Sequence, residues 1–316
     1  MNKKKAILFS VGALGTLSVS ALSIIGNYFY NLALNPNTSK EAIFGSPEDA
    51  KSTSGEIVHE ALNWLLEKSN YSDVYIESFD KLKLHGYKIL NEIPTDNWVI
   101  TVHGYTGKGS DMGNYAKNFY DMGYNILIPD LRAHGKSEGS YIGMGWDDRL
   151  DILKWIDVII NDNVNSKIIL HGISMGAATV SMTSGESLPP NVKVVIADCG
   201  YTSVWAQFSH QLKALYSLPD FPIMNASSVV SKFKAGYSLR EASVVKQVAK
   251  SKTPILFIHG DEDNFVPYRM MDELYNAANC EKEKLTIEGA GHAKASKVNP
   301  DLYWATIEKF IKKYLS

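Results

Sequence analysis

The side chains of this chain best suited to covalent chemistry are a serine and a histidine set among glycines. Ser174 is the middle residue of the pentapeptide GISMG at 172–176, directly after an apolar run at 168–170 and directly before a helical pattern. A strand that turns at once into a helix strains its middle residue and presents that side chain at the tip. The hydroxyl then lies over a helix N-terminus, where aligned amides favour negative charge. This context predicts that Ser174 is a nucleophile.

A serine hydroxyl is a weak nucleophile until a base removes its proton. The best base is His292, which follows the tripeptide GAG in a short loop between a strand-like run and the last helical pattern. Four other histidines are interpreted as structural, packing or surface residues, or as lying outside the core: His59, His85, His171 and His210.

A catalytic histidine needs a carboxylate that holds its tautomer and stabilises the imidazolium. The segment HGDEDNFVP at 259–267 follows a strand-like run and contains three acids. Asp263 is placed to reach inward, whereas Asp261 and Glu262 shape the turn. Asp198, at the end of the strand-like run 192–197, is a further candidate. We predict Asp263 as the acid and keep Asp198 and Asp261 as alternatives.

Acyl transfer also builds an oxyanion, which needs preorganised hydrogen-bond donors. One expected donor is the backbone N–H of Met175, directly after the nucleophile. The second is expected in the loop HGYTG at 103–107, which follows the apolar run 98–102. There the N–H of Tyr105 is the predicted donor.

These side chains require a scaffold in which strands and helices alternate. From residue 71 onward, short apolar runs rich in β-branched residues alternate with helical patterns. That rhythm predicts a mostly parallel sheet covered by helices on both faces. Residues 202–245 lack strand character but are rich in apolar side chains, and a structureless loop of that length is improbable in a compact domain. We predict a small helical cap there.

The sequence resembles the α/β-hydrolase superfamily from about residue 71 to residue 314. The resemblance is carried by HGYTG at 103–107, DLRAHGKS at 130–137, the serine pentapeptide, and the acid and histidine segments, which occur in the family's order. It implies the order Ser174, Asp263, His292 for nucleophile, acid and base, a structural role for His134, and lids inserted where the cap is expected. Among members, the chain looks closest to bacterial hydrolases that carry an N-terminal membrane segment.

We therefore expect a serine hydrolase that cleaves a carboxylic ester of a small molecule through an acyl-enzyme. Amidases, peptidases and thioesterases use the same machinery and remain alternatives. A non-catalytic binding module on a hydrolase scaffold is a further alternative, because fold does not determine function. The mechanism requires no metal or organic cofactor.

Composition limits the other classes. Apolar residues make up 45% and charged residues 21% of the 316 residues, which is ordinary for a globular protein. The net charge of -2 gives no electrostatic case for binding nucleic acid. The two cysteines, Cys199 and Cys280, are expected to be free and buried, although one disulfide is possible.

The N-terminus has the pattern of a membrane segment. Three lysines at 3–5 precede an uncharged run at 6–25, and about twenty apolar residues suffice to cross a bilayer. Because apolar and aromatic residues continue to Leu34, we predict an uncleaved single-pass anchor with the enzyme outside the cytoplasm. A cleaved signal segment and a secreted protein are the alternative. The expected organisation is an anchor or signal segment at 1–34, a linker and short helix at 35–70, and a hydrolase domain at 71–316 with a cap at about 202–245.

Overall fold

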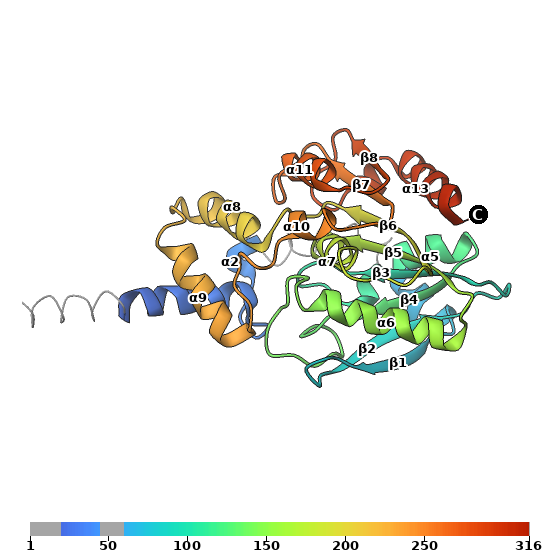
Figure 1. The fold of residues 1–316 in the computed structure, drawn as a ribbon, viewed down its shortest axis with the longest axis horizontal. Helices are drawn as coiled ribbons and strands as arrows, with labels where there is room; N and C mark the ends of the chain where they lie inside the picture. Colours follow the sequence, from blue (N-terminus) through green and yellow to red (C-terminus); the bar gives the residue numbers. More distant parts are fainter. Residues whose placement is uncertain (1–19, 45–59, 316) are drawn as a thin grey trace, which may run out of the picture.

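The computed structural model describes residues 20–44 and 60–315. In that part of the chain, an eight-stranded sheet has the order β1-β2-β4-β3-β5-β6-β7-β8 (Figure 1). Its strands are β1 (Ser72–Glu77), β2 (Lys83–Ile89), β3 (Asn97–Val102), β4 (Asn125–Pro129), β5 (Lys167–Ile173), β6 (Val192–Asp198), β7 (Ile255–Gly260) and β8 (Lys282–Ile287). β2 pairs antiparallel with β1 and β4, and all other neighbours are parallel.

Helices cover both faces of this sheet, as the alternating pattern predicts. They are η2 (Gly109–Met112), α5 (Gly113–Asp121), α6 (Asp148–Asp162), α7 (Met175–Thr183), α10 (Val244–Val248), α11 (Arg269–Ala277), α12 (Ala295–Val298) and α13 (Pro300–Leu315). Side chains of β3 alternate between two hydrophobic cores, because successive residues of a strand point to opposite faces. Trp98 and Ile100 belong to the core beneath α6 and α7, whereas Val99 belongs to the core beneath α5 and α13. The predicted fold class is confirmed.

The segment expected to form a cap is helical. It contains α8 (Val204–Tyr216) and α9 (Ile223–Ala235), which stand away from the sheet (Figure 1). The hydroxyl of Ser203 accepts the N–H of Ala206 and so caps the first turn of α8. An isolated antiparallel bridge between Ser203 and Ser243 joins the two ends of the insertion.

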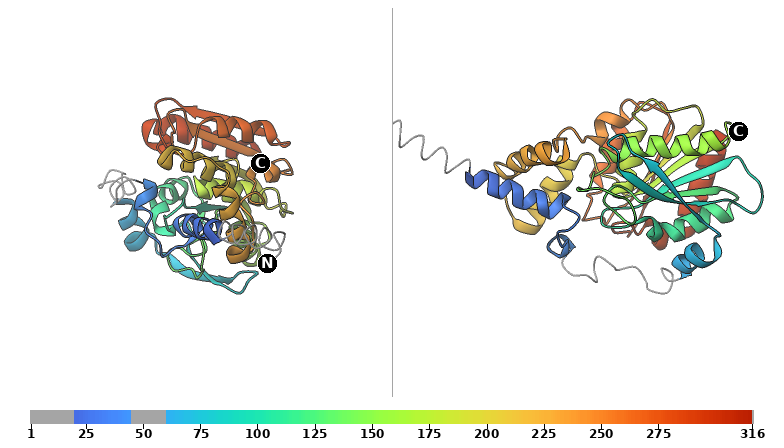
Figure 2. Two further views of the ribbon diagram at one scale, coloured as in Figure 1. Left: turned by 90° about the vertical axis from the view of Figure 1, so that its left-hand side faces the viewer. Right: turned by 90° about the horizontal axis from the view of Figure 1, so that it is seen from below.

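The predicted membrane anchor is contradicted. Among residues 20–44 and 60–315, no helix is long and apolar enough to cross a membrane. Residues 20–34 are helical and lie along the cap helices (Figure 2). Tyr30 and Leu34 of this segment belong to the main hydrophobic core, and Leu32 is also buried, so these apolar side chains have protein partners. Residues 1–19, on which the alternative of a cleaved signal segment depends, lie outside the described residues.

The region expected to be a linker and a short helix is described only in part. Residues 35–44 end in a short helix, α2 (Glu41–Phe44), and residues 45–59, including Ile57, lie outside the described residues. The following helix ends as η1 (Trp64–Lys68), and its buried face contains Trp64 and Leu65. The neighbouring Leu66 is 40% exposed.

Candidate active site

The candidate site forms where parallel strands end at one edge of the sheet. Ser174 directly follows β5 and precedes α7, with φ 56° and ψ −115°, a combination that side-chain-bearing residues rarely adopt. The turn requires glycine on both sides. A Cβ at Gly176 would lie 2.1 Å from the carbonyl oxygen of Val102, and one at Gly172 would lie 2.3 Å from the backbone of Gly176. The elbow predicted from the sequence is therefore present in the backbone.

The serine is hydrogen bonded to the predicted base, and the base to the predicted acid. The Nε2 atom of His292 lies 2.9 Å from the Oγ of Ser174. The Nδ1 atom of the same ring lies 2.7 Å from Oδ2 of Asp263. The three residues follow β5, β7 and β8, so the parallel sheet brings together positions that are 118 and 29 residues apart in sequence. The arrangement permits proton transfer from the serine hydroxyl to an oriented imidazole.

The environment of Asp263 favours its ionised form. Burial alone would raise its pKa, but hydrogen bonds from His259 and His292 outweigh this and hold the pKa of Asp263 well below its usual range. The other carboxylate oxygen accepts the backbone N–H groups of Phe265 and Val266, at 2.9 Å and 2.8 Å. An acid fixed in this way can orient the imidazole and stabilise its protonated form.

The two alternative acids make other contacts. Asp198 accepts a hydrogen bond from the Tyr303 hydroxyl at 3.0 Å. Burial raises the pKa of Asp198 to about 6, although that hydrogen bond opposes the shift. Asp261 accepts the backbone N–H of Gly289 at 2.8 Å, in keeping with the predicted role in shaping the turn.

The other histidines that the structure describes around the sheet and cap are held by different partners. His85 is buried, and its two ring nitrogens lie 2.7 Å and 2.6 Å from carboxylates. His171 is buried in β5 with a ring nitrogen 2.8 Å from the Thr101 hydroxyl. His210, on α8, lies 3.0 Å from a backbone carbonyl of the acid loop. His59 lies outside the described residues.

Backbone amides flank the nucleophile on two sides. The loop 103–107 lies against Ser174: a Cβ at Gly104 would be 3.4 Å from the Cβ and 3.9 Å from the Oγ of the serine. Met175 is the first residue of α7, where N–H groups have no partner inside the helix. The assignment of the Tyr105 and Met175 N–H groups as oxyanion donors remains a prediction.

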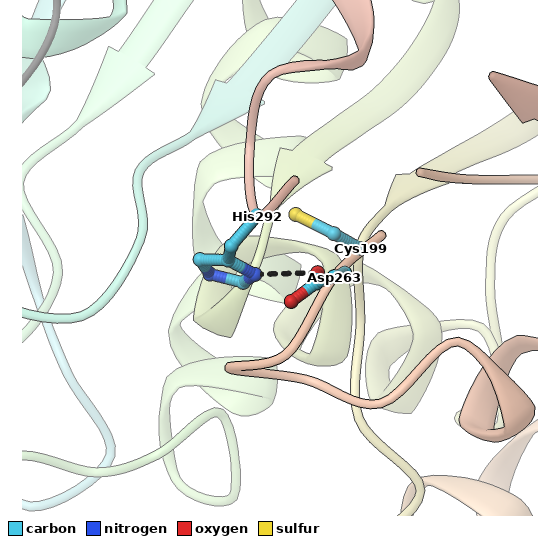
Figure 3. A group of neighbouring side chains, drawn as sticks. All are labelled: Cys199, Asp263 and His292. Carbon is cyan, nitrogen blue, oxygen red and sulfur yellow. Dashed lines mark hydrogen bonds and ion pairs between the residues drawn. The ribbon is translucent and has the colours of Figure 1, made fainter. Parts of the chain in front are cut away.

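A thiol lies beside the acid and the base. One potential ligand atom from each of Cys199, Asp263 and His292 lies within 4.8 Å of the others (Figure 3), and these residue types can bind zinc. However, Nδ1 of His292 already bonds Asp263. Burial also raises the pKa of the Cys199 thiol well above its ordinary value, and a protonated thiol is a poor ligand. The group therefore fits a hydrogen-bonded acid and base better than a metal centre. Both cysteines are free, although Cys280 is only partly buried.

An apolar cavity opens beside Ser174. Its volume is about 80 Å³, whereas one water molecule needs roughly 10–15 Å³. Among the described residues that line it, none is charged. The lining comes mainly from the serine elbow, the loop 103–107 (the predicted oxyanion loop), α8, α9 and the helical residues 20–34. Such a cavity suits a narrow apolar group bound next to the nucleophile.

Sequence reasoning missed several residues around this site. His259 lies 3.2 Å from the carboxylate of Asp263. It could have been found from the sequence, because it belongs to the His-Gly pair that precedes the predicted acid. Gln207 and Gln211 on α8 both donate to the carbonyl of Phe265, each at 2.8 Å, and so join the cap to the acid loop. Their spacing of one helical turn indicates only a shared face. The contribution of residues 29–34 to the cavity was missed because their apolar character was attributed to a membrane.

Comparison with known proteins supports this reading of the fold. A family model described as serine aminopeptidase, S33, matches residues 94–219, which include Ser174 but end before the acid and the histidine. The uncharacterized protein YqkD of Bacillus subtilis is 29% identical over 97% of each chain. Lysophosphatidylserine lipase ABHD12 of Xenopus tropicalis is 24% identical over 59% of this chain and 48% of its own length. A solved structure of the Pyrococcus furiosus esterase Pf2001 has 26% identity and a TM-score of 0.64, covering 79% of this chain and 92% of that one. The chain is an α/β-hydrolase by fold, and its relatives support a hydrolase.

Proposed function

We propose that this α/β-hydrolase is a serine esterase that works through an acyl-enzyme. The observation that carries the proposal is the hydrogen-bonded series Ser174–His292–Asp263, with distances of 2.9 Å and 2.7 Å, whose serine lines a cavity without charged lining residues in the described part of the chain. The catalytic unit would extend from about residue 71 to residue 316, with its cap at about residues 202–245.

The proposed reaction has two halves. Ser174 Oγ attacks the ester carbonyl carbon while Nε2 of His292 takes the hydroxyl proton. The tetrahedral intermediate collapses, the carbon–oxygen bond to the alcohol breaks, and His292 returns the proton to the departing alkoxide. Water then attacks the acyl-enzyme with His292 again as base, and the carboxylic acid and free serine are released. Throughout, Asp263 keeps the imidazole oriented and stabilises its positive charge.

The backbone N–H groups of Tyr105 and Met175 would stabilise the oxyanion in both halves. They belong to different elements, the loop after β3 and the first turn of α7, and both border Ser174. Donors fixed by the backbone need no reorganisation as charge develops on the substrate oxygen. That property makes them effective in a water-poor site.

An ester with an apolar acyl group fits the cavity better than a peptide does. The described lining has no carboxylate or ammonium group that would pair with a charged residue of a peptide. Amide and thioester cleavage use the same triad, and the substrates themselves distinguish these reactions.

Labelling with a fluorophosphonate tests the proposal. The full chain should be labelled and should hydrolyse p-nitrophenyl esters, and Ser174→Ala should abolish both. Ser184→Ala is a matched control, because Ser184 is a buried serine at the other end of α7 that bonds only to backbone. Folded wild type that neither labels nor turns over esters would refute the esterase and favour the binding-module alternative. Faster cleavage of matched amides or thioesters would move the proposal to those substrates.

A further inference from the structure

The helical residues 20–34 form one wall of the cavity beside the nucleophile. The cavity is lined from this helix by Phe29, Tyr30, Leu32, Ala33 and Leu34. The opposite side comes from cap residues such as Leu212 of α8 and Met224 of α9. The family model matches residues 94–219. Residues 20–34, which form this wall, therefore lie outside the matched region.

The first half of the helix is fixed to the cap. Gly26 packs directly on α9: a Cβ there would lie 2.7 Å from the backbone carbon and oxygen of Ala226. The ammonium of Lys234, also on α9, donates to the side chain of Asn27 at 2.6 Å. Backbone contact of this closeness leaves no room for the helix to move toward α9.

The last turn of the helix is fixed to the catalytic body. The Tyr105 hydroxyl donates to the Ala33 carbonyl at 2.6 Å, so the oxyanion loop and the helix are directly joined. The ammonium of Lys40 donates to the carbonyl of Leu32 at 2.7 Å. Burial lowers the pKa of Lys40 to about 8. The helix therefore extends from the cap to the loop 103–107, and its residues 29–34 contribute to the cavity lining.

We propose that residues 20–34 measure the acyl chain of the substrate, which is an ester of a narrow, unbranched acyl group. This inference rests on the proposed esterase function. We assign the near end of the wall to Ala33, because its carbonyl accepts from the Tyr105 hydroxyl and the neighbouring Gly104 lies against Ser174. Phe29 lies one turn earlier, about 6 Å along the axis, with its ring 5.6 Å from that of Tyr216. An acyl tail that runs along the helix meets Ala33 first and the Phe29–Tyr216 pair later.

This geometry gives substitutions at the two positions opposite effects. Each methylene buried in an apolar pocket raises kcat/KM roughly four-fold until the tail reaches a wall. Phe29→Ala removes the distant wall, so the rise should continue to longer chains, with a gain of roughly four-fold for the first chain beyond the wild-type plateau. Ala33→Phe fills the near part, so the plateau should move to shorter chains.

The experiment compares the full-length wild type, Phe29→Ala, Ala33→Phe and the control Ile24→Ala. Ile24 lies on the same helix but is 71% exposed and is not among the lining residues. For each protein, kcat/KM is measured with p-nitrophenyl esters from acetate to palmitate. Labelling of Ser174 by a small fluorophosphonate is measured in parallel.

The inference is supported if the preferred chain lengthens in Phe29→Ala, shortens in Ala33→Phe and stays unchanged in the control. If Ala33→Phe does not fold, the inference is judged on whether the preferred acyl chain lengthens in Phe29→Ala. If wild type is labelled but the chain-length profiles of the variants coincide with that of the control, the measuring role is wrong while the esterase stands. If wild type is not labelled, the esterase proposal itself fails and the inference fails with it.

Discussion

Replacing Asp198 by asparagine tests the electrostatics of the site and the choice of the catalytic acid together. Asp198 is fully buried at the end of β6. One carboxylate oxygen accepts from Tyr303, and the other has no hydrogen-bond partner among the described residues. Burial raises its pKa from 3.8 to about 6, against the hydrogen bond from Tyr303. At neutral pH the folded protein therefore holds a carboxylate in a site that disfavours its charge.

The size of this effect follows from the pKa shift. At about 1.36 kcal/mol per pKa unit, a rise from 3.8 to about 6 lowers the free energy of unfolding by about 3 kcal/mol at neutral pH. Because the pKa of Asp198 is raised in the folded state, protonation of this carboxyl favours the folded protein. Its stabilising contribution to the free energy of unfolding is complete below the unfolded pKa of 3.8 and is lost as the pH rises through about 6. About half of the change, roughly 1.5 kcal/mol, develops between about pH 5 and about pH 8.

Urea unfolding of wild type and Asp198→Asn across this pH range measures the effect. The asparagine variant should gain about 1.5 kcal/mol relative to wild type on going from about pH 5 to about pH 8. Any hydrogen bond that the new amide makes or lacks shifts both ends equally and leaves this difference unchanged. The variant should also keep its ester hydrolysis. A stability difference that is independent of pH would refute the electrostatic reasoning, and a loss of turnover comparable to that of Asp263→Asn would assign the acid to Asp198.

Three further predictions test separate parts of the structure. Asp263→Asn should lower kcat by on the order of 10⁴ with little change in KM, and steady-state kinetics would contradict its assignment as the acid if kcat fell less than ten-fold. Gly176→Ala places a Cβ 2.1 Å from a backbone oxygen, whereas Gly200→Ala comes no closer than 3.2 Å. Thermal unfolding should show the first losing about 3 kcal/mol and the second much less. Arg132→Met leaves the buried carboxylate of Asp151 without its two hydrogen bonds of 2.9 Å. It should cost about 3–5 kcal/mol in urea unfolding, and a loss below 1 kcal/mol would contradict the importance of this pair.

Much of the fold could be predicted because local patterns and the sheet agree. Short β-branched runs such as residues 98–102 occur as buried strands, and the insertion at 202–245 is helical. The elbow was recognisable because its glycines lie between a strand and a helix, and the turn itself requires Gly172; the requirement for Gly176 comes from the carbonyl of Val102 on the neighbouring strand. Even where an element was expected, its burial was harder to assign. Leu66 is exposed because a π-helical turn at 64–68 alters the face that points inward.

The choice among the acids depended on the tertiary structure. Asp198 ends β6 and Asp263 follows the parallel strand β7, so both were expected at the same edge of the sheet. Their distances from the imidazole depend on how the loops after β7 and β8 fold toward one another. In the structure Asp263 lies 2.7 Å from His292, whereas Asp198 is bonded to Tyr303 of α13.

The sequence by itself determined the strand and helix order, the strained serine turn and the edge of the sheet at which the acids and the histidine gather, because these follow from local chemistry and chain order. Only the tertiary structure decided what covers the apolar residues 29–34. Hydropathy measures the preference of a side chain to leave water, and that preference is satisfied equally by lipid and by another protein surface. Packing of Gly26 on Ala226 and the bond from Tyr105 to Ala33 identify the partner as the cap and the oxyanion loop. Those contacts join residues about 200 and 72 positions apart, a separation that no local pattern encodes.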